Sequence, residues 1–198
     1  MAPKFLDLTF TDSVREAQRH YYGASLRMED APKCDALTED ETGFIESRDS
    51  FYLATITETG WPYIQHRGGR RGFLHVITPS SLAFADYKGN RQMISTGNLA
   101  TTDRVALLLM DYPQRTRLKI LGHARVEDAR QHPGLLAQLA EPEVRQVVER
   151  VFIIDVVSFD WNCPKYIAPR YTIEEIEELI LPLRQRIVEL EDKLKTGH

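Results

Sequence analysis

Two short segments of this chain concentrate the residue types that bind an anionic ligand. Gln65–Arg67 presents an amide, an imidazole and a guanidinium in succession, and Lys88–Gln92 places two cations around a Gly-Asn pair. Arginine offers a bidentate fork to a phosphate group, whereas lysine offers a point charge. Amide side chains both donate and accept hydrogen bonds, so they suit the edge of a ring that carries both donors and acceptors. The two segments together predict a site for a phosphorylated ring ligand.

A second interpretation of the same residues stays open at this point. If Gln65–Arg67 forms a strand, Gln65 and Arg67 point to one face of the sheet and His66 points to the other. Charged side chains also protect an exposed edge strand against aggregation. A solvated basic edge strand therefore explains the segment as well as an anion site does.

The distribution of charge favours a small ligand over a polyanion. The net charge is −4, which does not favour nucleic acid as a partner. Between Gln65 and Gln92, however, there are five Lys or Arg and one acid, Asp86, whose expected role is to orient Arg91 or Lys88. We expect a local anionic ligand at this basic island, and we leave Asp86 out of the predicted ligand set.

Other chemistries have weaker support in the sequence. The histidines show no spacing typical of a metal site, so no metal is expected. Ser95–Gly97 lacks the flanking glycines of a nucleophile elbow. The two cysteines, Cys34 and Cys163, are far apart, which fits a reducing compartment. With no signal-peptide pattern at the start and no apolar run of the ~18 to 20 residues that span a membrane, we expect a cytoplasmic protein without membrane contact.

The elements that would hold these residues are mostly strands. Apolar and β-branched residues, separated by turns, predict seven strands at 51–57, 61–67, 73–77, 82–86, 105–110, 116–127 and 152–157. Gly122 marks a bulge or bend in the sixth of them. Helices are predicted at 12–20, from Thr38 with Glu41 as a capping box, and at 135–140 and 143–148. Antiparallel strands at this spacing predict a β-barrel.

The C-terminal segment has a different pattern. Thr172 and Glu175 form a second capping box, and apolar residues then recur in steps of three and four, at Ile173, Ile176, Ile180, Leu183, Ile187, Leu190 and Leu194. Such a heptad seam is typical of a helix that pairs with another helix. Pro182 lies inside it and predicts a break or kink, at a cost of about 3 kcal/mol in a continuous helix. Two short amphipathic helices packed on the barrel are the other interpretation.

A family resemblance extends from about residue 12 to residue 170. The sequence resembles the pyridoxamine 5′-phosphate oxidase-like family of FMN-binding split barrels. The segments that carry the resemblance, in order, are 51–55, 60–62, 65–69, 72–74, 85–92, 97–99, 117–122 and 161–167. The order and spacing of these segments are more specific than any one of them.

The resemblance implies a six-stranded antiparallel split β-barrel with N-terminal and C-terminal helices. It implies an N-terminal helical segment at 1–50, the barrel at 51–170 and an amphipathic helical tail at 171–198. It also implies a homodimer that binds flavin mononucleotide (FMN) at the subunit interface. The positions that correspond to cofactor-contacting segments are Gln65, His66, Arg67, Lys88, Asn90, Arg91, Gln92, Arg117, Trp161, Asn162, Lys165 and Arg170. Arg117 replaces a glutamine of the oxidase.

Three functions are compatible with this sequence. The first is an FMN-dependent oxidoreductase acting on an unidentified small molecule, because flavin supplies the redox chemistry and the protein supplies orientation. The second is a module that stores or senses flavin without turnover. The third is the same barrel with haem or a deazaflavin, in which His66 or His75 could be a ligand. No residue is assigned a catalytic role.

Overall fold

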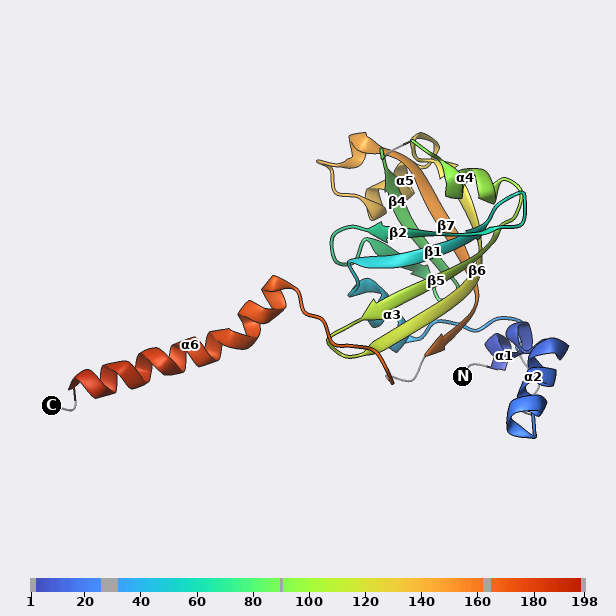
Figure 1. The fold of residues 1–198 in the computed structure, drawn as a ribbon. Coiled ribbons are helices and arrows are strands. Elements are labelled where there is room, and N and C mark those ends of the chain that lie inside the picture. Colours follow the sequence, from blue (N-terminus) through green and yellow to red (C-terminus); the bar gives the residue numbers. More distant parts are fainter. Residues whose placement is uncertain (1–2, 26–31, 90, 162–164, 197–198) are drawn as a thin grey trace. The chain divides into compact units, whose positions relative to one another are not determined.

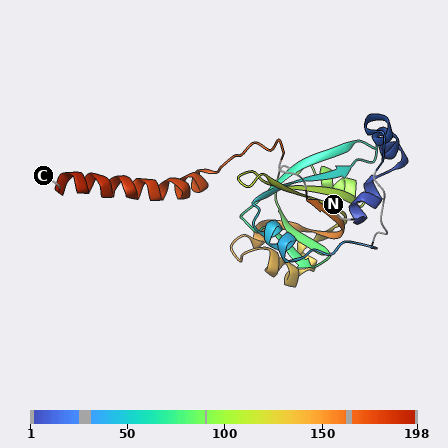
Figure 2. The same ribbon diagram turned by 90° about the horizontal axis from the view of Figure 1, so that it is seen from below.

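The computed structural model describes residues 3–25, 32–89, 91–161 and 165–196 of the 198-residue chain. Its centre is one antiparallel sheet of seven strands in the order β2-β1-β5-β6-β7-β4-β3. The strands are β1 (Ser50–Ile56), β2 (Pro62–Gly68), β3 (Leu74–Thr78), β4 (Ser81–Tyr87), β5 (Arg104–Asp111), β6 (Thr116–Asp128) and β7 (Val148–Trp161). The sheet curls around an interior, as both ribbon views show (Figure 1 and Figure 2). The predicted split barrel is confirmed, with seven strands instead of six.

The alternation of side chains along the strands builds the barrel core. In β1, residues 51, 53 and 55 are buried and the residues between them are more exposed. Phe51, Leu53, Phe84, Leu107 and Phe152 are among the side chains of this core, each at most 1% exposed. Burying one such side chain contributes about 1.5–3 kcal/mol, so the barrel core is the main source of stability.

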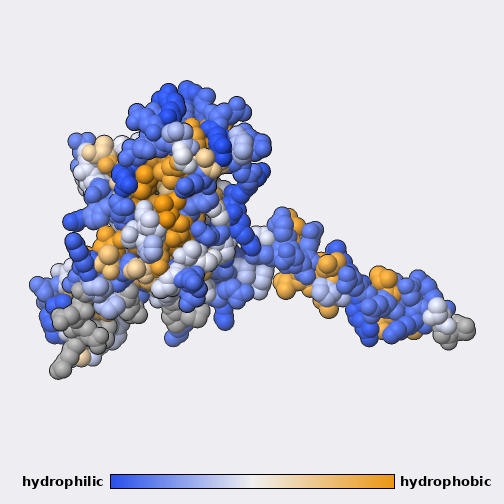
Figure 3. Space-filling model, turned by 180° about the vertical axis from the view of Figure 1, so that it is seen from behind, coloured by the Kyte–Doolittle hydropathy of each residue, from blue (hydrophilic) through white to orange (hydrophobic). Residues whose placement is uncertain are grey.

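A smaller apolar cluster lies on the other side of β4. Ala83 and Ala85 of β4 pack there with Leu139 of α5 (Pro133–Leu139) and Val151 of β7. Strand β4 is therefore buried on both faces, which explains its nearly continuous apolar sequence. Apolar side chains also reach the surface in a band on the back of the barrel (Figure 3).

Several helices differ from the sequence-based expectation. The structure adds α1 (Pro3–Thr9) and α4 (Ile94–Leu99), which were not predicted, and confirms α2 (Asp12–Tyr22) and α3 (Glu39–Glu46). The helix expected at 143–148 is wrong, because only a 3₁₀ turn forms at Arg145–Val147 and β7 begins at Val148. The backbone of this segment joins the sheet: Val147 accepts a hydrogen bond from the Lys88 amide, and Val148 pairs with Tyr87. Sheet pairing here outweighs local helix propensity.

Gly122 occupies the irregularity that the sequence predicts in β6. The register between β6 and β7 shifts between Leu121 and Gly122. A Cβ atom at Gly122 would lie 2.6 Å from the carbonyl oxygen of Asp155, so the two backbones can approach this closely only with glycine.

The chain divides into two compact units. One comprises residues 1–110 and 117–163, and the other comprises 111–116 and 164–198. The second unit contains α6 (Ile173–Thr196), whose start is capped as predicted: the Glu175 carboxylate accepts from the Thr172 amide at 2.9 Å and the Thr172 hydroxyl accepts from the Glu175 amide at 3.2 Å. The helix continues through Pro182, so the predicted break is absent, and the ribbon bends in the first part of the helix (Figure 1). Among the described residues, no helix is both long and apolar enough to cross a membrane.

A hydrogen-bonded cap ties the N-terminal segment to the last strand. Glu41 closes the predicted capping box of α3 by accepting from the Thr38 amide at 2.9 Å. Its other carboxylate oxygen accepts from the indole N–H of Trp161 at 2.6 Å, and the Trp161 ring meets Phe44 edge to face at 4.8 Å. Burial raises the pKa of Glu41, but the bonds from Thr38 and Trp161 outweigh it, and the net pKa is below the usual range.

Replacing Glu41→Ala should lower the free energy of unfolding by about 1–3 kcal/mol, because it removes the cap and leaves the Trp161 N–H without an acceptor. Since the pKa of Glu41 is lowered on folding, its contribution is present above the carboxylate's ordinary pKa and is lost as the pH falls through the lowered value. Urea denaturation at neutral and acidic pH measures both effects. Glu39→Ala is the matched control, since Glu39 lies in the same first helical turn but is exposed. Equal losses for the two variants would contradict the proposed role of the Trp161 bond.

Candidate functional site

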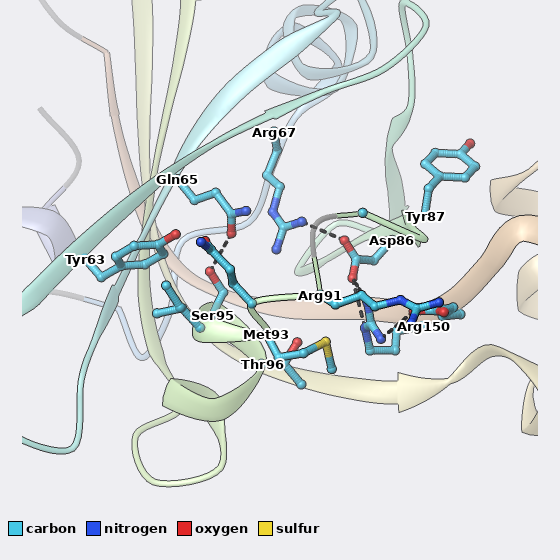
Figure 4. Close-up of a pocket in the computed structure, with 14 residues that line it drawn as sticks. Tyr63, Gln65, Arg67, Asp86, Tyr87, Arg91, Met93, Ser95, Thr96 and Arg150 are labelled. Atoms are coloured by element: carbon cyan, nitrogen blue, oxygen red, sulfur yellow. Dashed lines mark hydrogen bonds and ion pairs between the residues drawn. The ribbon is translucent and has the colours of Figure 1, made fainter.

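The basic segments predicted from the sequence meet in a cavity of about 200 Å³. The cavity lies between the edge strand β2, the end of β4, the connection into α4 and the start of β7 (Figure 4). Its lining residues are Tyr63, Gln65, Arg67, Asp86, Tyr87, Gly89, Arg91, Gln92, Met93, Ile94, Ser95, Thr96, Glu149 and Arg150.

Strand β2 presents its residues to the cavity in alternation. Gln65 and Arg67 pair with Leu53 and Phe51 of β1 and share their side of the sheet, so they point into the cavity. His66 points to the opposite face, where it is exposed and its ring lies 5.7 Å from that of Tyr52. The predicted alternation of this strand therefore holds.

The floor of the cavity is a carboxylate held between two arginines. Asp86 Oδ1 accepts from Arg67 Nη1 at 2.6 Å, and Asp86 Oδ2 accepts from Arg150 Nε at 2.9 Å. The three side chains are only 10 to 18% exposed. Asp86 and Arg150 are directly opposite each other in the pairing of β4 with β7, which places their side chains on one face.

Arg67 retains hydrogen-bonding capacity that the protein does not use. Its guanidinium lies over the rings of Phe152 and Phe84, with its carbon 5.0 and 5.7 Å from the ring centres. Its Nε atom is buried and has no hydrogen-bond partner among the described residues. A buried donor without an acceptor is costly, so an acceptor atom supplied by a ligand would stabilise this arrangement.

The rim of the cavity is strained. Arg91 and Met93 adopt positive φ angles of 62° and 57°. Residues with a Cβ atom enter this region at a cost of about 1–3 kcal/mol and cluster at ligand-binding sites. Within the described residues Arg91 has no ion-pair partner, and its side chain lines the cavity (Figure 4).

Helix α4 is held against the sheet by two polar contacts. The Ser95 hydroxyl donates to the Gln65 side-chain oxygen at 2.9 Å, and the Asn98 amide donates to the Thr55 hydroxyl at 2.8 Å. Ser95, Asn98 and Thr55 are all buried. The first bond fixes the orientation of the Gln65 amide and leaves its NH₂ group available to a ligand.

The structure brings together some of the predicted site residues and separates others. Gln65, Arg67, Arg91 and Gln92 line the cavity, whereas His66, Lys88, Arg117 and Trp161 do not. Arg117 is partly buried in β6, and its Nε has no partner among the described atoms. Asn90 and Asn162 lie outside the described residues.

Lys165 and Arg170 belong to the second unit. There the Lys165 ammonium lies 5.4 Å from the Tyr166 ring centre, and the Arg170 guanidinium carbon lies 4.9 Å from that of Tyr112. A role of these two residues in ligand binding stays a prediction, as does that of the other residues outside the cavity.

Sequence reasoning missed Arg150. This residue lies 64 positions after Asp86, between the helix predicted at 143–148 and the strand predicted at 152–157, so nothing in the local pattern linked the two. The only available signal was a lone acid in the basic island, which demands a cation, and Asp86 was expected to pair with Arg91 or Lys88. Its observed partners are Arg67 and Arg150.

Neither histidine considered as a haem ligand lines the cavity. His75 lies in a groove between the β2–β3 loop and α5, and burial lowers its pKa despite the nearby Glu46 carboxylate. Within residues 3–25, 32–89, 91–161 and 165–196, no group of three or more His, Cys, Asp or Glu side chains could hold a metal ion.

Comparison with known proteins places this geometry in a family. The model of the pyridoxamine 5′-phosphate oxidase family matches residues 37–153, more than half of the chain. The chain belongs to this family. The match includes every residue that lines the cavity and confirms the resemblance expected from the sequence. No curated protein matches the sequence.

The similar solved structures are distant in sequence. A putative pyridoxamine 5′-phosphate oxidase of Lactobacillus delbrueckii is 23% identical with a TM-score of 0.50, covering 64% of this chain and 94% of its own. An FMN-binding protein of Syntrophomonas wolfei is 13% identical with a TM-score of 0.43, covering 62% and 83%. HupZ of Group A Streptococcus is 13% identical with a TM-score of 0.49, covering 68% and 99%. At this identity the first similarity shows the fold alone.

Replacing Asp86→Ala should lower the free energy of unfolding by about 3 kcal/mol, because it leaves two largely buried arginines without their carboxylate. The control is Asp155→Ala, which removes an ion pair to Arg125 whose side chains are 57 and 51% exposed. Exposed pairs contribute about 0–1 kcal/mol, so this variant should unfold almost as the parent does. Urea denaturation compares the two. Similar urea midpoints for the two variants would mean that the buried cluster does not stabilise the fold more than an exposed ion pair does.

Proposed function

We propose that this protein binds FMN, with its phosphate at the arginine pair in the cavity. The observation that carries the proposal is the Arg67–Asp86–Arg150 cluster, in which one carboxylate serves two guanidinium groups. Glu149 accepts from Arg150 Nη1 at 2.9 Å, but it is exposed and adds little screening at the cavity floor. The excess of donors at this floor suits a phosphate dianion, which accepts several charge-assisted hydrogen bonds.

The other lining residues fit the remaining parts of the same ligand. The Gln65 amide is already oriented by Ser95, and Tyr63 and Gln92 add polar groups along the wall. These side chains offer both donors and acceptors to the polar edge of an isoalloxazine ring. When bound, the flavin supplies electron and hydride transfer, and the protein's positive charges favour its reduced, anionic form. Deazaflavin would use the same polar groups, whereas neither candidate haem ligand reaches the cavity.

Comparing FMN with riboflavin, which lacks the phosphate, tests this proposal. Flavin fluorescence should show tighter binding of FMN than of riboflavin to the parent protein. Arg150→Ala should weaken FMN binding by about 1.5–3 kcal/mol, roughly 10- to 150-fold in Kd, with little effect on riboflavin binding. Arg125→Ala, at an exposed arginine outside the cavity, is the matched control. Equal binding of FMN and riboflavin by the parent protein would show that the phosphate lies elsewhere.

The proposal includes a homodimer that completes the site. A cavity of about 200 Å³ is smaller than the roughly 300–1,000 Å³ that small-molecule sites usually provide. The outer face beside it is apolar: Tyr52 and Ile56 of β1 and Ile64 of β2 are 39, 40 and 66% exposed, and Leu108 of β5 lies next to Tyr52. Because Ile64 and Gln65 are neighbours on β2, a second subunit on this face would meet the edge of the cavity.

A charge placed on this face should separate the subunits. Ile64→Lys should shift the mass measured by light scattering from dimer to monomer and weaken FMN binding, since an unpaired charge at an apolar interface is costly. Ile77→Lys is the control, because Ile77 is 38% exposed but lies on β3, at the opposite end of the strand order. A monomeric parent protein that binds FMN tightly would overturn the shared-site proposal.

The proposal extends from flavin binding to catalytic turnover. We assign the protein as an FMN-dependent oxidoreductase for a small molecule, with storage or sensing of flavin as the alternative. Anaerobic addition of nicotinamide donors separates them through the flavin absorbance, which bleaches in an oxidoreductase and persists in a storage protein.

A further inference from the structure

Helix α6 presents an apolar stripe along its whole length. None of its side chains is buried, and Ile173, Ile187 and Leu194 are 72, 55 and 77% exposed. In Figure 3 apolar side chains recur along the helix between hydrophilic ones. An isolated helix gains little from such residues, whereas covering them contributes about 25 cal/mol per Å².

The residue types along the stripe select one kind of partner. In heptad positions, the a sites are Ile173, Ile180, Ile187 and Leu194, and the d sites are Ile176, Leu183 and Leu190. Isoleucine at the a sites combined with leucine at the d sites favours a coiled coil of two parallel helices, because the side chains of each type pack best in that geometry. Three of the four a sites and two of the three d sites follow this rule.

The charges beside the stripe agree with a parallel pair of identical helices. In that arrangement a g residue faces the e residue five positions later in the second copy, which brings Arg186 to Glu191 and Leu179 to Arg184. The first pair is attractive and the second is an aliphatic contact. In an antiparallel pair with the greatest overlap, Arg184 would face Arg184 and Arg186 would face Arg186 of the second copy, and both contacts are repulsive.

Pro182 is compatible with this arrangement. It occupies a c position between Leu181 and Leu183, on the outer side of the heptad. The helix continues through it, so the seam is not interrupted. The proline ring and the unpaired carbonyl four residues earlier do not have to enter the helix–helix contact.

We infer that α6 binds α6 of a second copy of this chain as a parallel two-stranded coiled coil. This surface is separate from the flavin site and from the apolar face of β1 and β2. Both proposed contacts join two identical copies, each by the same surface of the two chains. A parallel coil then adds to the strength of the dimer through effective concentration, without new contacts at the cavity.

Disulfide formation reports this contact independently of flavin binding and of the barrel contact. In the full-length chain with both native cysteines replaced by serine, Leu194→Cys places a thiol at an a site, where parallel partners lie within disulfide distance. It should oxidise to a covalent dimer at least about tenfold faster than Val188→Cys, since only the a site gains a high effective concentration of its own counterpart. Val188 is a b residue, 56% exposed, and is equally tethered to the chain.

A second substitution confirms that the seam causes the cross-link. Adding Ile187→Lys to the Leu194→Cys chain should abolish its faster disulfide formation, whereas adding Val188→Lys should preserve it. Residues 187 and 188 are 55 and 56% exposed in the single chain, so only their place relative to the seam distinguishes them. Circular dichroism checks that the barrel stays folded. Equal cross-linking of the 188 and 194 variants, or no effect of Ile187→Lys, would overturn the parallel coil and would leave the flavin proposal untouched.

Discussion

The pairing of β4 with β7 places one carboxylate between two arginines, and the candidate site depends on that contact. Asp86 holds Arg67 and Arg150 through bonds of 2.6 to 2.9 Å in a largely buried position. Without it, two guanidinium groups would share a poorly solvated space and repel each other. With it, both are fixed, and donors remain available on Arg67, which among the described residues bonds Asp86 through Nη1 alone. The cluster is therefore a structural element and a potential binding element at the same time.

Strand β2 connects this cluster to the rest of the molecule. Its alternate residues serve two environments, with Gln65 and Arg67 toward the cavity and Ile64 and His66 toward the outer face. A strand can serve two environments because its successive side chains point to opposite faces of the sheet. A residue on the outer face of β2 is therefore only one position along the chain from a residue that lines the cavity. This proximity is the physical reason why the proposed dimer contact and the proposed ligand site would affect each other.

Polar caps at both ends of the sequence organise the remaining parts. Glu41 joins α3 to Trp161, the last residue of β7, so the N-terminal segment and the final strand depend on each other. Trp161 has a structural partner here, and that bond accounts for a tryptophan at the end of the barrel. The C-terminal helix has its own cap at Thr172 and an uncovered seam, which is typical of a segment whose partner is another chain.

The sequence alone determined the elements whose signals are local. Period-two alternation predicted the strands, glycine predicted the irregularity of β6, and Thr-x-x-Glu spacing predicted two helix starts that the structure confirms. The basic island predicted that Gln65, Arg67, Arg91 and Gln92 would lie together, as they do in the cavity.

Tertiary structure decided what depends on contacts between distant segments. Arg150 enters the site because β7 begins early and pairs with β4 in a register that places it opposite Asp86. The same pairing converted an expected helix at 143–148 into a turn and a strand. Hydrogen bonds between strands are made between residues far apart in the chain, so no local pattern encodes their register. The sequence predicted an anion site, and the sheet decided which arginines line the candidate cavity.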